Sequence, residues 1–556
     1  MGCLIKRGCM WKAAIIISVI LFYCPTILAQ IDTAWTATYD GPDHREDNPN
    51  IMKIDAMGNV YITGTSASDQ SVDIATVKYS SSGELLWAQR FSEEDVTCEV
   101  RDMEIDEWGN IYIAGIYHHW PDDNCMLIKY LPSGEGAWTS ILDMGSYHTS
   151  WASGIAFDTD GNVYLVGGAV MPNETYDALI IKYFPDGDTA WAKYYEYQNG
   201  NGDYADGIVY DSAGYLYIAG TTYFAECFNL LLILKCDLDG NAIWASTYTD
   251  PVLLPVQFGG GALGVKLDLN NDIVVMGNLN SSTAHYYSVL AKYHPNGDTV
   301  WVRKYVNSNG HSVYPIDFDI DSNGNIYIGC NQYFVDSMDD YVTLKYLPNG
   351  DTAWIRQYDG PGNYADFAHG LAVDNYGNVY VTGTAAKNSI GTIGWEYATV
   401  KYSTNGDLAW VAEYSNSNFD TTDSGEDIAL DSSGDIIVTG HSYYSGSINY
   451  HTIKYTQGTE NTDNDGSIPS LFSLSSIYPN PFNAQTIISY ALSKNGPVRL
   501  SIYNILGQRT ANLIDVVQQA GEHSIVWDAG TFPSGIYFAR LEMGKETRIG
   551  KLLLLK

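Results

Sequence analysis

Short apolar runs separated by turns rich in Asp, Asn, Ser and Gly recur along most of this chain. The clearest repeat has the form Asp-x-x-Gly-Asn-Val-Tyr-Ile-x-Gly, with local departures. Its copies lie at 55–64, 106–115, 158–167, 211–220, 268–277, 321–329, 374–383 and 431–440. A fixed internal period of this kind is typical of repeat architectures, in which one small unit is used many times.

Each repeat predicts four short β-strands. After the Val-Tyr-Ile run comes a strand ending in Lys-Tyr, and then a Gly that stands four residues before a Trp. The tryptophans of this pattern are Trp35, Trp87, Trp138, Trp191, Trp244, Trp301, Trp354 and Trp410. The Asp-x-x-Gly turns fit tight hairpins, because Asp bonds nearby backbone and Gly accepts positive φ. Four strands per repeat, apolar on both faces, predict an all-β propeller whose blades cover one another.

The two ends of the repeat region indicate how the ring closes. Trp35 comes before the first copy, whereas the last copy ends at Tyr455 without a Trp strand. We therefore predict that residues 31–40 supply the outer strand of the last blade, which gives an eight-bladed β-propeller over 30–456. An open solenoid would leave both end faces bare.

The first 29 residues have the order of a secretory signal peptide. Three cations precede a ten-residue apolar stretch, too short to span a bilayer, and a small residue follows at Ala29. Cys24 leaves a lipoprotein as the alternative. Without residues 1–29 the chain has 26 Lys and Arg against 65 Asp and Glu, a net charge of −39. That charge argues against nucleic acid and anionic membranes as partners, and no transmembrane span is expected in the mature protein.

A different pattern begins after a polar linker at 457–472. Residues 473–556 alternate apolar and polar positions between Gly, Pro and Asn turns, which predicts a small immunoglobulin-like β-sandwich. From Ile477 onward this segment carries eight Lys and Arg and five Asp and Glu, so it is weakly basic.

Both regions resemble known families. The repeats resemble the bacterial β-propeller repeats called SBBP, and the Gly-x-x-x-Trp ending is similar to the tryptophan-docking motif of eight-bladed quinoprotein dehydrogenases. The motifs of 477–556, such as Tyr-Pro-Asn-Pro-Phe-Asn at 478–483, resemble the type A C-terminal sorting domain of the type IX secretion system. That resemblance implies secretion or outer-membrane surface display and the secretion machinery as a partner. The positions that carry it are Pro479, Asn480, Pro481, Phe482, Asn483, Gly507, Gly535, Tyr537, Lys551 and Lys556.

We find no catalytic set, and we predict no cofactor and no metal site. Gly259–Gly264 fits Gly-x-Gly-x-x-Gly, but no helix follows to bind a phosphate. The acidic linker around Asp463 lacks the closing Glu of a calcium loop, and His118 and His119 would point apart on a strand. The adjacent Cys pair of many quinoproteins is missing, and arginines are too scattered for a sialidase.

The long connections are the best candidates for function, because variable loops on a rigid scaffold commonly carry binding sites. They are predicted to emerge on one side of the ring and are rich in Tyr, Trp, Asn, Asp and His. The candidates near the channel mouth are Trp120, His148, Trp151, Tyr204, Asp206, Tyr364, Asp366, His369 and Glu426. The leading hypothesis is a binding or structural protein for a polysaccharide or protein ligand. A hydrolase or lyase using acids such as Asp206 and Glu426 is the alternative, and a pyrroloquinoline quinone enzyme is a third.

Overall fold

The chain divides into two compact units, residues 1–458 and 459–556, in the computed structural model. The structure describes residues 31–69, 71–144, 149–171, 175–197, 202–224, 228–248, 260–280, 285–307, 311–333, 339–362, 364–387, 394–416, 422–444, 446–457, 473–478, 482, 485–492, 494, 496–505, 507–518, 521–544 and 546–554. The predicted signal peptide, most of the predicted linker and His148 lie outside these residues. All regular elements within them are β-strands, which confirms the all-β class.

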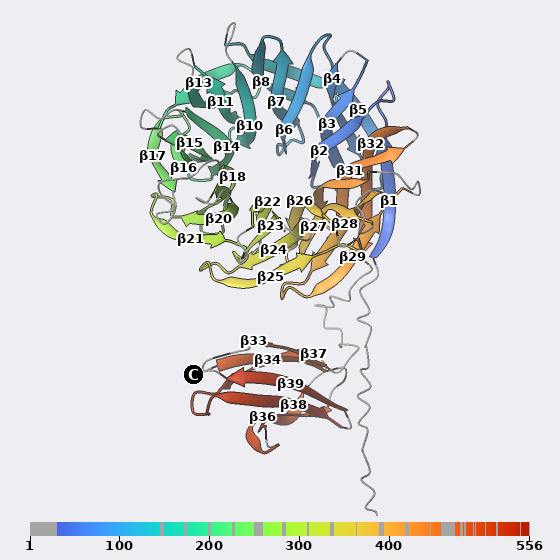
Figure 1. The fold of residues 1–556 in the computed structure, drawn as a ribbon, viewed down its shortest axis with the longest axis vertical. Coiled ribbons are helices and arrows are strands. Elements are labelled where there is room, and N and C mark those ends of the chain that lie inside the picture. The colour runs from blue at the N-terminus through green and yellow to red at the C-terminus, as the bar shows by residue number, and fades with distance from the viewer. Residues whose placement is uncertain are drawn as a thin grey trace, which may run out of the picture. The chain divides into compact units, whose positions relative to one another are not determined.

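The first unit consists of antiparallel four-stranded sheets arranged around one axis (Figure 1). Two groups of four strands are joined into one eight-stranded sheet. The first group is β2 (Asp47–Ile54), β3 (Val60–Ala67), β4 (Val72–Tyr79) and β5 (Leu85–Phe91). The second group is β6 (Thr97–Ile105), β7 (Ile111–His119), β8 (Asp122–Tyr130) and β9 (Gly136–Leu142). The connection between the two groups is a single parallel pair, Val72 with Thr97.

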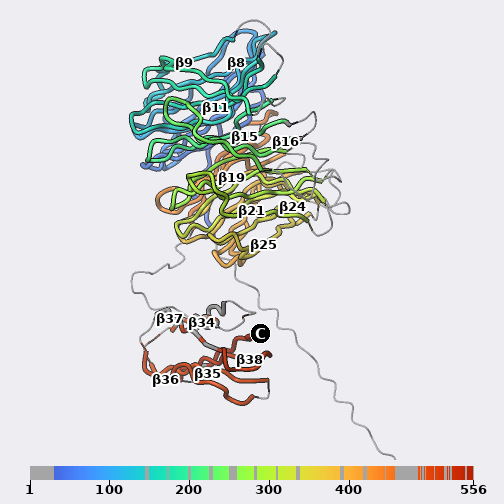
Figure 2. The backbone as a smooth tube through the Cα atoms, turned by 90° about the vertical axis from the view of Figure 1, so that its left-hand side faces the viewer, coloured from blue at the N-terminus to red at the C-terminus, as the bar shows by residue number. Residues whose placement is uncertain are grey.

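Five further sheets follow in chain order with the same strand sequence from the inside outward. They are β10 (Ser150–Phe157), β11 (Val163–Val170), β12 (Tyr176–Tyr183), β13 (Thr189–Tyr195); β14 (Gly202–Asp211), β15 (Tyr215–Phe224), β16 (Phe228–Asp237), β17 (Ala242–Tyr248); β18 (Gly260–Leu267), β19 (Ile273–Asn280), β20 (Tyr286–Tyr293), β21 (Thr299–Tyr305); β22 (Val313–Ile320), β23 (Ile326–Gln332), β24 (Asp340–Tyr346), β25 (Thr352–Tyr358); and β26 (Phe367–Val373), β27 (Val379–Ala386), β28 (Trp395–Tyr402), β29 (Leu408–Tyr414). Figure 2 shows this unit from the side, with neighbouring sheets packed one beside the next.

The remaining sheet combines the two ends of the repeat region. It contains β30 (Ser424–Leu430), β31 (Ile436–Tyr444), β32 (Ser447–Gln457) and, on its outer edge, β1 (Ile31–Tyr39). Strand β1 pairs antiparallel with β32 from Ile31 opposite Gln457 to Tyr39 opposite Tyr450. The innermost strands contact one another in order, and β30 of this sheet also contacts β2.

Repeated tryptophans contact the neighbouring sheet or group of strands. The indole Nε1 of Trp87 donates to the carbonyl of Pro132 in the following group, β6–β9, at 3.2 Å, and Lys78 Nζ donates to the same oxygen at 3.3 Å. The Trp87 ring lies so close to Gly134 that a Cβ on this glycine would be 2.7 Å from Cδ2. Trp35 makes the same pair of contacts with Ser81 and Gly83. The repeated Trp and Gly therefore join neighbouring sheets.

The second unit has two sheets with a common core. One contains β33 (Ser473–Tyr478), β34 (Gln485–Leu492) and β37 (Gly521–Asp528), and the other β36 (Arg509–Gln518), β35 (Gly496–Asn504), β38 (Gly535–Met543) and β39 (Glu546–Leu554). Buried side chains from both, among them Ile488, Trp527, Leu500 and Leu552, pack together. This core is the physical reason for the apolar alternation in the sequence.

The Trp–Gly contact can be tested with two glycines that share a left-handed backbone. Gly134 (φ 88°) faces the Trp87 ring, whereas Gly434 (φ 80°) has nothing within 4 Å of an added Cβ. Replacing either by Ala costs about 1–2 kcal/mol of backbone strain. We expect Gly134→Ala to cost an additional ~1–3 kcal/mol from the steric clash.

The measurement is chemical denaturation of the chain without residues 1–29, monitored by tryptophan fluorescence. Equal losses of stability for Gly134→Ala and Gly434→Ala would show that the turn does not need a bare Cα beneath the indole.

Candidate functional site

A β-bulge at the same place in every innermost strand turns one side chain out of the regular ladder. The strand pairing skips one residue between Ala205 and Gly207, for example, and equivalent shifts occur in the other inner strands. The eight bulged residues are Asn50, Arg101, Ser153, Asp206, Leu263, Ile316, His369 and Glu426. Bulges commonly re-aim side chains near binding sites, and three of these eight are candidates predicted from the sequence.

Three consecutive bulged residues line one cavity of about 260 Å³. Its walls are formed by Arg101, Ile116, Asp123, Thr149, Trp151, Ser153, Tyr204 and Asp206. The structure therefore brings together three sequence candidates, Trp151, Tyr204 and Asp206, which come from the inner strands β10 and β14.

Aromatic rings form one wall of this cavity. The Trp151 ring lies 6.0 Å from Tyr176 and 6.3 Å from Tyr204, between ring centroids. A Cβ on Gly168 would be 2.2 Å from the Trp151 ring, so this glycine lets the indole lie directly against β11. Trp151 remains half-buried. A fixed and partly exposed indole is a suitable surface for stacking a ligand.

The polar side of the cavity combines an acid that stays protonated with a cation. Burial raises the pKa of the Asp206 carboxyl to about 8, although Thr221 Oγ1 donates to it at 3.2 Å and partly offsets this effect. At neutral pH the carboxyl is therefore mainly uncharged and can donate a hydrogen bond. Arg101 Nη2 lies 2.9 Å from Glu99 Oε1. His118 Nδ1 lies 2.8 Å from Asp123 Oδ1.

A second group of polar residues surrounds Glu426. His369 Nδ1 lies 3.2 Å from Glu426 Oε2, His441 Nδ1 lies 3.3 Å from Oε1, and Ser424 Oγ donates to Oε1 at 2.7 Å. These contacts outweigh burial and hold the pKa of Glu426 well below its usual range, while the Glu426 charge raises the pKa of His369 despite burial. Ser424 Oγ contacts His369 through the same Nδ1 that faces Glu426. The three residues therefore lack the relay of a serine hydrolase, which uses both ring nitrogens.

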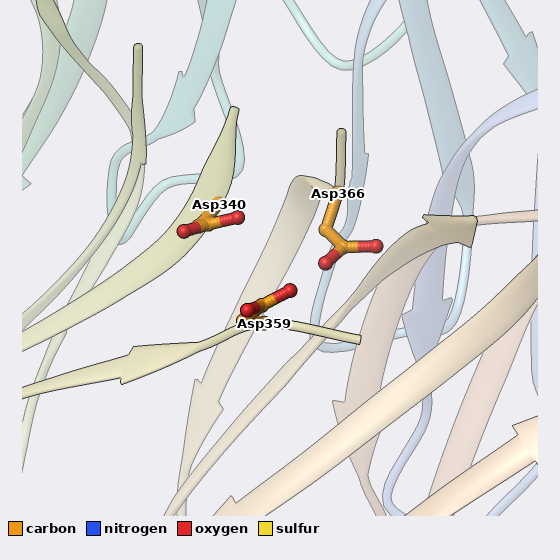
Figure 3. A group of neighbouring side chains, drawn as sticks. All are labelled: Asp340, Asp359 and Asp366. Carbon is orange, nitrogen blue, oxygen red and sulfur yellow. The ribbon is translucent and has the colours of Figure 1, made fainter. Parts of the chain in front are cut away.

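Asp366 belongs to a third group and supports a loop. It is fully buried, and its carboxylate accepts N–H bonds from Gly360 at 2.5 Å and from Ala386 at 2.9 Å. Figure 3 shows it with Asp340 and Asp359, and one carboxylate oxygen from each residue lies within 4.8 Å of the others. The cavity walls include none of these three residues.

The remaining sequence candidates do not line the cavity. Trp120 is 90% exposed beyond the end of β7, Tyr364 is half-buried, and His148 lies outside the described residues. Sequence reasoning missed Arg101, Asp123 and His441 as site residues. Arg101 could have been found by aligning the repeats, because it has the same place in its inner strand as Asp206 and Glu426.

In the second unit, Phe482 and Tyr537 are buried against Trp527, at ring distances of 5.4 and 5.3 Å. Gly507 (φ 75°) closes a turn onto the Asn504 carbonyl, and Lys551 is exposed on β39. Pro479, Asn480, Pro481, Asn483 and Lys556 lie outside the described residues.

Comparison with solved structures finds only distant similarity. PorZ, a surface component of the type IX secretion system of Porphyromonas gingivalis, is 11% identical over 92% of this chain and 74% of its own, with a TM-score of 0.31. The polysaccharide lyase Uly1 is 10% identical over 63% and 89%, with a TM-score of 0.39. The WD40 domain of fission yeast SCAP is 8% identical over 78% and 98%, with a TM-score of 0.43. Comparison with curated proteins gave no match.

Two family models match parts of the chain. Residues 353–390 match the β-propeller repeat family SBBP, and residues 476–555 match the secretion system C-terminal sorting domain. Among the described residues no helix is long and apolar enough to cross a membrane. The chain thus joins β-propeller repeats to a type IX C-terminal sorting domain, which makes it a secreted or outer-membrane surface protein.

Proposed function

We propose that this protein is displayed outside the cell as an eight-bladed β-propeller whose cavity around Trp151 binds a sugar unit of an extracellular polysaccharide. The carrying observation is the convergence of Trp151, Tyr204 and Asp206 on one cavity of about 260 Å³. Residues 1–29 would be removed on export, 457–472 would link the two domains, and 473–556 would engage the secretion machinery.

The eight-bladed ring is part of this proposal. Pairing of β1 with β32 and the contact of β30 with β2 support closure by the N-terminal strand. Trp35 supports it further, because the indole on this outer strand contacts the turn at Gly83 in the group β2–β5.

The chemistry of the cavity favours a neutral sugar. The indole offers an apolar face to a sugar ring, and the protonated Asp206 can both donate to and accept from hydroxyl groups. A polyanion is disfavoured because Glu99 already partners Arg101 and the mature chain has a net charge of −39. The cavity is also small and concave, unlike the broad surface that a folded protein partner needs.

A secreted hydrolase or lyase is the second candidate, and the raised pKa of Asp206 favours it, since a protonated acid near neutral pH suits general acid catalysis. Glu426, the other acid considered, does not line the cavity, which leaves Asp123 as the second carboxylate there. Asp206→Asn that binds a polysaccharide normally but no longer cleaves it would support this candidate over pure binding.

Removing the indole should abolish most of the binding. We expect Trp151→Ala to weaken sugar affinity at least about tenfold, which corresponds to ~1.4 kcal/mol of lost stacking and apolar contact. The ligand would be found on a glycan array and its affinity measured by calorimetry. Trp120→Ala is the matched control, because Trp120 is exposed and lies outside the cavity. The sugar affinity of this variant should be unchanged. Unchanged binding by Trp151→Ala would contradict the proposed site.

The pH dependence of binding tests the role of Asp206. Its folded pKa of about 8 means that the carboxyl donates a hydrogen bond below pH 8 and becomes a charged acceptor above it. Affinity should therefore fall several-fold between about pH 7 and pH 9, since one hydrogen bond contributes about 1 kcal/mol. Asp206→Asn keeps a donor at every pH, so its affinity should stay flat across this range. A parallel decline in both proteins would exclude Asp206 as the titrating group.

A further inference from the structure

One position of the inner strands, two residues before the bulge, is aromatic in several sheets. In β10 and β14 this position holds Trp151 and Tyr204, which both line the cavity. In β22 and β26 it holds Tyr314 and Phe367. We call these four residues the aromatic arc. Each lies near the start of its inner strand, so Tyr314 and Phe367 are at the same end of the inner strands as the cavity.

The aromatic arc extends over consecutive strands. The inner strands β10, β14, β18, β22 and β26 contact one another in this order, along one side of the central axis (Figure 1). Strand β18 has Gly261 at the arc position, where a Cβ would be 1.8 Å from Thr221 Oγ1 and no side chain fits. Its bulged residue, Leu263, is 46% exposed, so this strand also presents apolar surface.

The other three inner strands have polar residues at the same position. These residues are Asn48 in β2, Glu99 in β6 and Ser424 in β30. The bulged residues of these three strands are polar or charged as well. Aromatic and polar positions are therefore segregated around the axis, and an exposed apolar surface bordered by polar residues is typical of a binding region.

A second aromatic ring packs against the outer members of the arc. The Tyr314 ring lies 5.1 Å from Tyr286, and the Phe367 ring lies 5.9 Å from Trp395, between ring centroids. Tyr314 is 41% exposed, and Phe367 is half-buried. Because the second ring restricts the rotation of each side chain, little conformational entropy is lost when a ligand stacks on it. The arc thus repeats the arrangement found at Trp151, a fixed aromatic ring that remains partly exposed.

From this arrangement we infer that the protein binds several consecutive sugar units of a polysaccharide chain along the aromatic arc, with the Trp151 cavity as one subsite. The inference rests on the proposed binding of a sugar unit and adds the length and the course of the ligand. Each sugar ring has an apolar face of C–H groups that stacks on an aromatic side chain. A polymer repeats this face along its length, so it contacts rings on separate strands, whereas a single sugar unit reaches only the cavity.

The residues around the arc favour a neutral polymer. In the five inner strands from β10 to β26, neither the arc position nor the bulge holds Lys or Arg. These positions therefore lack the charge-assisted hydrogen bonds that recognise the carboxylate or sulfate groups of an acidic polysaccharide. The bulged residue of β26, His369, already lies 3.2 Å from Glu426 Oε2. Arg101 of the cavity walls is likewise paired with Glu99.

Oligosaccharides of increasing length test this inference. The probes are neutral ladders from cellulose, laminarin, xylan and mannan, from the disaccharide to the hexasaccharide, titrated by calorimetry into the chain without residues 1–29. In a ladder that binds, we expect the hexasaccharide to bind at least about tenfold more tightly than the disaccharide, because the additional units stack on the arc. Equal affinity at both lengths, lost in Trp151→Ala, would overturn the arc and leave the proposed function intact. Absence of binding by every ladder would overturn both.

Tyr314→Ala separates the arc from the cavity. This variant should weaken hexasaccharide binding at least about threefold through the loss of one stacked ring. Its disaccharide affinity should be unchanged, because Tyr314 is not among the cavity walls, and that result also shows that the variant is folded. Trp151→Ala should weaken the binding of both lengths. Tyr314→Phe keeps the ring and should bind the hexasaccharide as tightly as the wild-type chain.

Tyr376→Ala is the matched control. Tyr376 is 63% exposed and lies in the turn that follows β26, at the opposite end of this strand from Phe367. Both affinities of this variant should be unchanged. The arc would be wrong if Tyr314→Ala bound the hexasaccharide as tightly as the wild-type chain, or if Tyr376→Ala weakened its binding to the same extent.

Discussion

The arrangement of the sheets depends on the packing of a tryptophan indole directly against the backbone of a glycine turn. Within the described residues, seven of the eight repeated tryptophans, all but Trp410, cover a glycine turn of the next sheet or group. In six of these seven the indole N–H donates to a carbonyl of that turn, as Trp87 does to Pro132 and Trp301 to Pro348. The turn must have positive φ and no Cβ, and only glycine satisfies both conditions cheaply. Trp191 is the exception, because its buried Nε1 has no partner within the described residues.

Because other positions join the sheets, the bulged residue of each inner strand can vary in identity. The Trp, Lys and Gly positions join neighbouring sheets, so the bulged residue in each inner strand is not needed for that purpose. Its side chain can be Arg101, Asp206, Leu263 or Glu426 without altering the register on either side. Combinations of neighbouring bulges then create local chemistry, an uncharged acid beside an indole in one place and a histidine–carboxylate group in another.

The sequence was sufficient for the repeat, the strand content and the sorting domain, because each depends on local patterns such as Asp-x-x-Gly turns and Gly-x-x-x-Trp. It also predicted Trp151, Tyr204 and Asp206 as candidates, because they lie near the start of inner strands. It could not group them, because the cavity depends on which bulges are neighbours and on how deeply Asp206 is buried. Asp366 shows the opposite case, since its loop position suggested ligand binding while its oxygens accept backbone N–H groups. Trp120 is aromatic and exposed, yet it lies beyond the cavity.

The residue that follows each bulge determines how its inner strand contacts the next inner strand. Where this residue is glycine, the next inner strand approaches closely, and a Cβ on Gly154 would lie 3.4 Å from the Cα of Gly207. Where it is aspartate, the carboxylate instead accepts an N–H from the neighbouring inner strand, as Asp102 does from Ile155 and Asp427 from Met52, both at 2.8 Å. The Asp427 bond connects the last inner strand to the first.

Burial raises the pKa of Asp427 to about 7, so an ionised acceptor in this position carries an electrostatic cost. That cost is tolerable because the bond satisfies a backbone N–H that would otherwise be buried without an acceptor. Inner strands that differ in sequence at this position therefore contact the next inner strand in different ways, through a close approach at glycine or through one carboxylate.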